Sequence, residues 1–369
     1  MCDDGLVIDL SVMRDIRVDP QARIVRAQAG CTLGDLDRAT HVHGLTVPVG
    51  VISKTGIAGL TLGGGVGWLV RKYGLTCDNV LAFEVVTASG KVVTANSGDN
   101  EDLFWGLRGG GGNFGIVVDF TYRAHPVHTV LGGLIVYARE QAGQVLRLYR
   151  QAIETAPDEL TAYAALLHTP DGAPVAAIIP CWCGDIEQGE RVLKPLREFG
   201  PPVMDAIQPM PFPQMQSLLD DAFPNGNQNY WKSTFVREFN DAAIDLLVDH
   251  ANRAPSPLSA IVIEFYGGAA SRVSPTETAF GSRQPEYDIG ILAQWPDRAD
   301  TDRNVTWTRA LFDALQPYAS GAFLLNFLDQ EEDAVIRASF GRNYNRLVEL
   351  KRKYDPENFF RQNHNIKPS

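Results

Sequence analysis

Glycine is concentrated in two short stretches of this 369-residue sequence, and no other feature restricts its fold as strongly. Of the 34 glycines, seven lie between Gly50 and Gly67 and six between Gly106 and Gly115. Because glycine adopts positive φ angles and lets the backbone approach a ligand closely, such stretches expose N–H groups that can surround phosphates or a flat ring. Tight turns in a β-rich domain would also use glycine, but two such stretches in one domain favour a nucleotide-binding loop.

The common nucleotide-binding motifs do not match these stretches. The sequence has no Gly-x-x-x-x-Gly-Lys-[Ser/Thr], which excludes a P-loop nucleotide hydrolase. The glycines at 63–67 do not form Gly-x-Gly-x-x-Gly, and no strand–turn–helix unit with an acidic residue about 20 positions further on surrounds them. A nicotinamide-binding Rossmann domain is therefore poorly supported.

Charge and composition narrow the range of partners. Lys and Arg number 33 against 44 Asp and Glu, and the net charge of −11 argues against nucleic acid. No apolar run approaches the roughly 18 residues of a membrane span, so no membrane insertion is expected. The five cysteines are scattered and odd in number, which indicates a reducing compartment and predicts a cytoplasmic protein. The cysteines and histidines lack metal-site spacing, and nothing in the sequence predicts the oligomeric state.

The chain is long enough for two or three domains, and its pattern changes near residue 126. Short strands and turns predominate before that point, whereas strands and helices alternate up to about residue 319. The second pattern predicts an antiparallel sheet covered by helices on one face. The predicted strands are 6–10 (buried), 23–29, 81–87, 91–95, 116–122, 134–137, 160–168, 175–181, 230–239, 259–266 and 287–295, and the predicted helices are 31–40 with Thr32 as N-cap, 138–156, 184–199, 242–250, 305–315 and 332–354.

Two parts of the sequence resemble one known family. The stretch from Gly44 to Pro126 is similar to the FAD domain of berberine-bridge-enzyme-like FAD-linked oxidases, of the vanillyl-alcohol-oxidase, PCMH-type superfamily. The carboxyl end is similar to the closing segment of the same family, and both parts occur in the right order. The matching residues are Thr55–Gly59, Gly63–Trp68, Arg71–Leu75, Cys77–Asn79 and Arg108–Ile116 in the first part and Asn343–Leu347, Lys351–Phe360 and Asn363–Ile366 in the second.

This resemblance implies a fold and a reaction. The expected fold is α+β, with a PCMH-type FAD-binding domain over residues 1–126 and an antiparallel-sheet substrate domain over residues 127–320. Residues 321–369 would form the closing segment and pack back on the FAD domain. The implied activity is an FAD-dependent oxidase that transfers a hydride from a small hydroxylated or amine-bearing organic substrate to flavin, with O₂ as acceptor. The alternative is a non-catalytic or flavin-poor remnant of the same family.

The resemblance also assigns residues to the cofactor. Glycine loops suit an anionic cofactor in an acidic protein, because they offer neutral backbone donors in place of lysines. Pyrophosphate and flavin would lie along the first glycine stretch, the adenosine end near residue 115, and the ribityl–flavin edge at the carboxyl tail. The assigned residues are Gly50, Val51, Thr55, Gly56, Ile57, Gly59, Gly115, Ile116, Val117, Asn363 and Asn365.

The sequence departs from the family at its beginning. The Gly-Gly-His segment that typically holds FAD through its histidine is missing ahead of Leu6–Leu10, so we expect a sequence truncated at its N-terminus. Ile52 occupies the position where some members carry a second, cysteinyl link to flavin. The two departures together predict FAD bound without a covalent bond. Thr55 aligns with a small residue that gates oxygen, which favours an oxidase over a dehydrogenase.

The family's catalytic tyrosine is also replaced. The Tyr-x-Asn-Phe pattern aligns with Leu324-Leu325-Asn326-Phe327, so Leu324 or Phe323 stands where the tyrosine would take a proton. The remaining candidates are Lys232, on a strand expected to face the flavin, and Glu264 with Tyr266, which share one face of a strand. A surface lysine and an outward glutamate are the competing interpretations. The predicted catalytic set is Lys232, Glu264, Tyr266 and Asn326.

Overall fold

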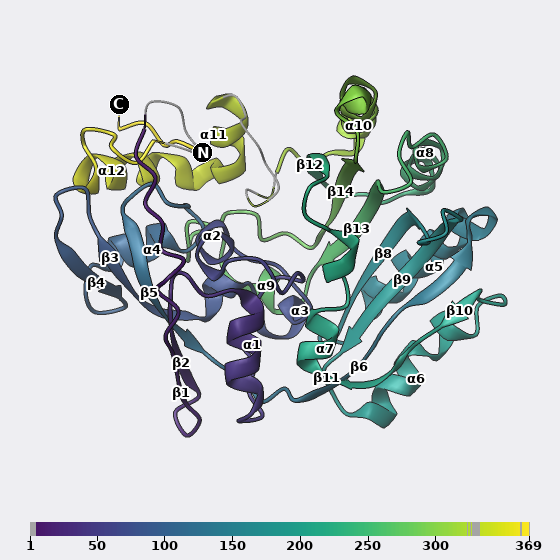
Figure 1. Ribbon diagram of the computed structural model, residues 1–369, viewed down its shortest axis with the longest axis horizontal. Helices are drawn as coiled ribbons and strands as arrows, with labels where there is room; N and C mark the ends of the chain where they lie inside the picture. The colour runs from purple at the N-terminus through teal and green to yellow at the C-terminus, as the bar shows by residue number, and fades with distance from the viewer. Residues whose placement is uncertain (1–4, 323, 325, 327–332, 362–363, 369) are drawn as a thin grey trace. The chain divides into compact units, whose positions relative to one another are not determined.

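The computed structural model describes residues 5–322, 324, 326, 333–361 and 364–368 (Figure 1). The chain forms two compact units. The first contains residues 1–128, 273–283 and 330–369, and the second contains residues 129–272 and 284–329. Residues 273–283, inside the range predicted for the second domain, therefore belong to the first unit. No helix in the described part of the chain is long and apolar enough to cross a membrane.

An antiparallel five-stranded sheet organises the first unit, in the order β1-β2-β5-β3-β4. The predicted strands 81–87 and 91–95 form a hairpin, because β3 pairs with β4 from Ala82 opposite Asn96 to Val86 opposite Val92. The segment Leu6–Leu10, predicted as a buried strand, instead has no regular secondary structure and pairs with no strand among the described residues, and Leu6 is 74% exposed. A short apolar run carries no information about a pairing partner, which explains the error. The strands are β1 Ile16–Asp19, β2 Ile24–Gln28, β3 Val80–Val86, β4 Val92–Asn96 and β5 Ile116–Arg123.

Short helices surround this sheet. The predicted N-cap is confirmed at Thr32, whose hydroxyl accepts a hydrogen bond from the Asp35 N–H, while the Asp35 carboxylate accepts one from the Thr32 N–H. This reciprocal capping fixes the start of α1. The helices of this unit are α1 Leu33–His41, α2 Ile57–Gly63, α3 Val70–Tyr73, η1 Thr76–Asn79, α4 Glu101–Leu107, α11 Asp333–Phe340, η7 Gly341–Asn343 and α12 Tyr344–Tyr354.

Two buried cations hold distant segments in the first unit. Arg283 is 1% exposed at its side chain and donates to both carboxylate oxygens of Asp78 at 2.7 Å. Lys351, on α12, donates to the carbonyls of Asn113 at 2.9 Å and Phe360 at 2.7 Å and pairs with Asp355 at 2.5 Å. Both cations are removed from water, which costs free energy, and the hydrogen bonds and opposite charges of their partners offset that cost.

A nine-stranded antiparallel sheet forms the second unit. Its main path runs β10-β7-β9-β8-β13-β14-β12, while β6 pairs with β9 and with β11. The strands are β6 Thr129–Gly132, β7 Ile135–Ala138, β8 Leu160–His168, β9 Pro174–Trp182, β10 Met204–Asp205, β11 Gln208–Pro211, β12 Gln228–Val236, β13 Ala260–Tyr266 and β14 Glu286–Trp295. The remaining elements are η2 Arg139–Gln141, α5 Ala142–Thr155, α6 Ile186–Arg197, α7 Phe212–Gln216, η3 Asp220–Ala222, α8 Asp241–Ala251, α9 Ala269–Arg272, η4 Arg298–Asp300, α10 Thr301–Leu315 and η5 Gln316–Tyr318.

One face of this sheet packs against helices, as predicted. Helices α5, α6, α8 and α10 bury their apolar sides there, and Figure 1 shows α5, α8 and α10 along the same side of the strands. Since side chains alternate along a strand, the neighbouring positions of β13 and β14 point to the opposite face. Ile263 and Ile289 lie in the helix-side core, whereas Glu264 and Asp288 lie on the other face.

Candidate functional site

The first glycine stretch is held by the start of α1. The N–H groups of Leu33 and Gly34 donate to the carbonyls of Thr55 and Ser53, both at 2.9 Å. The Ile57 N–H donates to the Cys31 carbonyl at 3.0 Å. These three hydrogen bonds fix residues 53–57 as a structured loop that leads into α2.

Two glycines of this loop border unfilled space. A Cβ added at Gly56 or Gly59 would meet no atom within 4 Å, whereas one at Gly67 would lie 1.8 Å from the Val49 carbonyl oxygen. Close backbone packing therefore explains Gly67 but not Gly56 or Gly59. Space beside a glycine backbone is what a ligand cradled by that backbone would need.

The carboxyl tail contributes a polar group to the same unit. Asn113 donates to the His364 carbonyl at 3.0 Å and accepts from the Ile366 N–H at 2.9 Å, which fixes the tail on either side of Asn365. The Oδ1 atom of Asn365 is buried and has no hydrogen-bond partner among the described residues. A buried amide oxygen without a donor points to a missing polar partner.

The second unit contains a buried pair of carboxyl groups. Glu264 on β13 lies directly opposite Asp288 on β14, and the two residues are 8% and 1% exposed. The Tyr266 hydroxyl lies 3.4 Å from Glu264 Oε2 and 3.4 Å from Asp288 Oδ2. Tyr163, on β8, is the cross-strand neighbour of Glu264 on its other side and is 2% exposed. Four ionisable side chains therefore form one buried row across three strands.

Burial keeps this pair partly protonated. It raises the pKa of Glu264 well above its usual range, and the charge of Asp288 raises it further. Burial also raises the pKa of Asp288, to about 7. Neither carboxyl has a Lys, Arg or His partner in the described part of the chain. Because two neighbouring buried carboxylates repel each other, the pair shares one proton near neutral pH and titrates as a unit.

Both ends of the chain match known protein families. Residues 1–96 match the family described as FAD binding domain, and residues 324–367 match the family described as berberine and berberine like. An FAD-linked oxidoreductase of Dictyostelium discoideum is 36% identical over 371 residues, covering 100% of this chain and 80% of the relative. The chain belongs to the berberine-bridge-enzyme-like FAD-linked oxidoreductases. FAD is the cofactor of this enzyme family.

Solved structures support the same assignment for this FAD-linked oxidoreductase. The structure of 6-hydroxy-D-nicotine oxidase from Arthrobacter nicotinovorans superposes with a TM-score of 0.91 at 28% identity, over 100% of this chain and 83% of that one. A berberine-bridge-enzyme-like protein of Physcomitrella patens gives a TM-score of 0.87 at 25% identity, over 97% and 80% of the two chains. The predicted PCMH-type fold with a helix-covered substrate sheet is thereby confirmed.

The FAD-linked oxidoreductase has features in its first unit that fit FAD. Open space adjoins Gly56 and Gly59, and the buried Oδ1 atom of Asn365 has no partner among the described residues. Both features are typical of a site that binds a cofactor. Gly115 has a different reason to be glycine, because an added Cβ would lie 2.6 Å from Val85 and 2.8 Å from the Val86 carbonyl. Val117 is buried at 3% exposure, so its side chain packs in the core. Asn363 lies outside the described residues.

The structure separates the predicted catalytic residues of this oxidoreductase. It brings Glu264 and Tyr266 together but places Lys232 on the helix-covered face, with its Nζ 4.7 Å from the centre of the Phe312 ring on α10. Strand alternation accounts for this difference, because Lys232 occupies an even position of β12, where the even-numbered side chains point toward α10. Leu324 is buried and Asn326 is exposed.

Sequence reasoning missed Asp288 as a partner of Glu264. The available signal was a charged residue inside the apolar run of β14, where every residue is buried. A charge in such a run is unusual and marks a candidate site. The pairing itself depends on the register between β13 and β14, which no local pattern specifies. Among the described residues, no group of three or more His, Cys, Asp or Glu side chains could hold a metal ion.

Proposed function

We propose that this FAD-linked oxidoreductase oxidises a small hydroxylated or amine-bearing organic substrate and that O₂ is its electron acceptor. The observation that carries the proposal is the buried Glu264–Asp288 pair with Tyr266 in contact with both carboxyls. A carboxylate in such a pair can accept a proton from a substrate hydroxyl or amine, and its raised pKa brings that exchange near neutral pH.

The proposed oxidation has two parts: the protein removes a proton from the substrate, and the cofactor accepts a hydride. FAD, when bound, would supply the acceptor for a hydride, and with it both electrons, from the substrate carbon that bears the oxygen or nitrogen. The ionised carboxylate of the pair takes the proton from that heteroatom. The Tyr266 hydroxyl, within reach of both carboxyls, holds the pair in place and can donate to whichever oxygen is charged. The substrate therefore loses one hydride and one proton and gains a C=O or C=N bond.

We assign the cofactor to the first unit. The backbone of residues 50–59 would hold pyrophosphate and flavin, with Asn365 at the ribityl–flavin edge. Ile52 offers no thiol, so this loop makes no cysteinyl bond, and Thr55 would border the path of O₂. The proposed contacts are Gly50, Val51, Thr55, Gly56, Ile57, Gly59, Gly115, Ile116, Val117 and Asn365.

The visible spectrum of the purified protein tests the proposal first. Bound flavin gives bands at roughly 370 and 450 nm, which a substrate should bleach without O₂ and which O₂ should restore. A panel of small alcohols and amines would identify the class of compound that bleaches the flavin. If flavin is absent even after FAD is added, or if it binds and no compound of either class reduces it, the proposal is wrong.

A valine at Gly56 is expected to weaken FAD binding without weakening the fold. Gly56 has φ −71° and ψ 138°, which valine adopts readily, and its Cβ would enter empty space. The Kd for FAD, measured by quenching of flavin fluorescence, should rise at least about tenfold, while the apo protein keeps its melting temperature. The matched variant Gly67→Ala should show the opposite pattern, with a lower melting temperature, because its Cβ would collide with Val49. An unchanged Kd in Gly56→Val would remove Gly56 from the cofactor site.

A further inference from the structure

The loop before β12 carries the only Asn-Gly dipeptide of the sequence, Asn225-Gly226. Both residues are exposed, and they form a turn between η3 and β12. Gly226 has φ +99°, which residues with a side chain rarely adopt, and a Cβ added there would meet no atom within 4 Å. The space around the peptide bond that joins the two residues is therefore open.

Hydrogen bonds do not hold the reactive groups of this dipeptide. The Gly226 N–H donates to no described residue, and the Asn225 side-chain amide has no hydrogen-bond partner in the described part of the chain. The two other asparagines of the loop differ, because the Asn227 amide donates to Gln294 Oε1 at 2.5 Å and the Asn229 amide donates to the Asn227 carbonyl at 3.0 Å. Asn225 is also the only one of the three that is followed by a residue without a side chain.

We propose that Asn225 is a site of spontaneous deamidation, a covalent modification whose only co-reactant is water. The Gly226 nitrogen loses its proton and bonds to Asn225 Cγ, while the bond from Cγ to Nδ2 breaks and the side-chain nitrogen leaves with that proton as ammonia. Water then opens the cyclic imide at either of its carbonyl carbons, which gives aspartate or isoaspartate. The reaction consumes one water and releases one ammonia, and nothing is oxidised or reduced.

Ring closure is easiest where the attacking nitrogen belongs to a glycine. A Cβ at position 226 would crowd the approach of the nitrogen to Asn225 Cγ, and Gly226 has none. The other two asparagines of the loop are followed by Gln228 and Tyr230, whose side chains hinder the same attack. Each of these asparagines must also lose a hydrogen bond before it reacts. We therefore expect Asn225 to react at least about tenfold faster than either of them.

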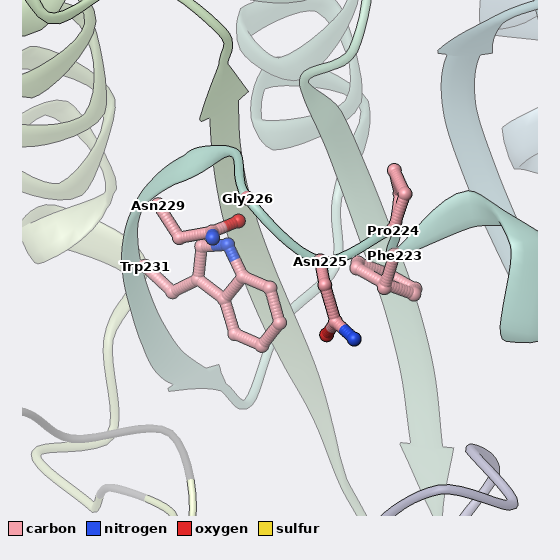
Figure 2. A pocket seen from close by; sticks show the side chains of 6 residues that line it. All are labelled: Phe223, Pro224, Asn225, Gly226, Asn229 and Trp231. Atoms are coloured by element: carbon pink, nitrogen blue, oxygen red, sulfur yellow. The ribbon is translucent and has the colours of Figure 1, made fainter.

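The modification changes the charge of a cavity. Asn225 lines a cavity of about 300 Å³ together with the rings of Phe223 and Trp231, which are 5.4 Å apart (Figure 2). All the residues that line this cavity are uncharged, so a carboxylate at position 225 would make its lining acidic and favour a cationic occupant over a neutral one. The lining residues are Phe223, Pro224, Asn225, Gly226, Asn229 and Trp231.

Peptide mapping by mass spectrometry tests the proposal on the full chain. After incubation of the folded protein in mildly alkaline buffer, the peptide that contains residues 225–229 should gain about 1 Da at Asn225. The modified peptide should separate into two forms, one with aspartate and one with isoaspartate. Because Asn227 and Asn229 lie in the same peptide, they serve as internal controls, and the rate at Asn225 should exceed theirs by at least about tenfold.

A comparison with the urea-unfolded chain separates the effect of the folded loop from that of the dipeptide alone. Because the loop holds neither reactive group of Asn225-Gly226, the folded protein should keep at least about a tenth of the unfolded rate at this site. The matched site is Asn96, whose Oδ1 accepts hydrogen bonds from the N–H groups of Gly98 and Asp99 at 2.7 and 2.8 Å. Folding should slow deamidation of Asn96 by more than about tenfold.

Two variants complete the test. Gly226→Ala should suppress the reaction, and Asn225→Asp should elute from an anion-exchange column with the aspartate form of the modified wild type, since both carry one more negative charge. If alanine disturbs the turn at Gly226, the wild-type comparison of the three asparagines decides alone. The proposal is overturned if Asn225 reacts less than about tenfold faster than its neighbours, if aspartate forms without isoaspartate, or if folding slows the reaction at Asn225 more than about tenfold. None of these outcomes depends on bound FAD, so the proposed oxidation is tested separately.

Discussion

Replacing Glu264 by glutamine is expected to slow anaerobic reduction of the flavin by about 10²- to 10⁴-fold, the usual contribution of a general base. Glutamine keeps the size of the side chain and a hydrogen-bond partner for Tyr266 but cannot accept a proton. The rate is measured by mixing the oxidised FAD-bound protein with substrate and following the loss of flavin absorbance in a stopped-flow instrument.

Two comparisons show whether this loss belongs to the buried pair. Asp249→Asn makes the same acid-to-amide change on an exposed part of α8 and should leave the rate unchanged. Lys232→Met should have a much smaller effect than Glu264→Gln, because Lys232 contacts Phe312 on the helix-covered face. A larger effect of Lys232→Met would reverse the order of the two candidates and contradict the assignment of Glu264.

Replacing Lys351 by methionine is expected to lower the free energy of unfolding by about 3–5 kcal/mol. Lys351 and Asp355 are both fully buried at their side chains, and Lys351 also binds the carbonyls of Asn113 and Phe360. Methionine fills the space but leaves the Asp355 carboxylate without its cation. Burial raises the pKa of Asp355, whereas the hydrogen bond from Lys351 and those from the N–H groups of Phe360 and Phe359 lower it. Because Lys351→Met removes the hydrogen bond from Lys351, the pKa of Asp355 should rise in this variant.

The control for this change lies two residues further along α12. Lys353 pairs with Asp102 at the surface, where its side chain is 59% exposed, so Lys353→Met should cost less than about 1 kcal/mol. Urea unfolding is measured for five proteins: the wild type, Lys351→Met, Asp355→Leu, the double variant Lys351→Met with Asp355→Leu, and Lys353→Met. The double variant should lose less free energy of unfolding than the sum of its two single changes, since it leaves no unpaired charge. Equal losses for Lys351→Met and Lys353→Met would contradict the account of the buried pair.

Local patterns were sufficient to predict most elements of the fold. Thr32 followed by Asp35 marks a helix start because the two residues cap each other, and α1 begins there. Strand β8 spans Leu160–His168 as predicted, since a long apolar run between turns leaves little choice of structure. The family and its FAD followed from motif residues that stand close together in the sequence.

What the sequence left undetermined depends on contacts between distant residues. The same alternation that placed Glu264 beside Tyr266 could not show which face of β12 carries Lys232, because that depends on where α10 packs. Arg283 belongs to the first unit through its bond to Asp78, some two hundred residues away. Leu6–Leu10 has a strand-like composition, but no strand in the described part of the chain pairs with it.

The pH profile of flavin reduction tests the central claim, that the Glu264–Asp288 pair takes the substrate proton. We predict that the single-turnover rate without O₂ rises with pH through a titration near 7, because burial raises the pKa of both carboxyls and only the ionised pair accepts a proton. That limb of the profile should be absent in Asp288→Asn, because Asp288 is the carboxyl that titrates near 7. A wild-type rate that is independent of pH between 5.5 and 8.5, or a limb near pH 7 that persists in Asp288→Asn, would contradict the claim.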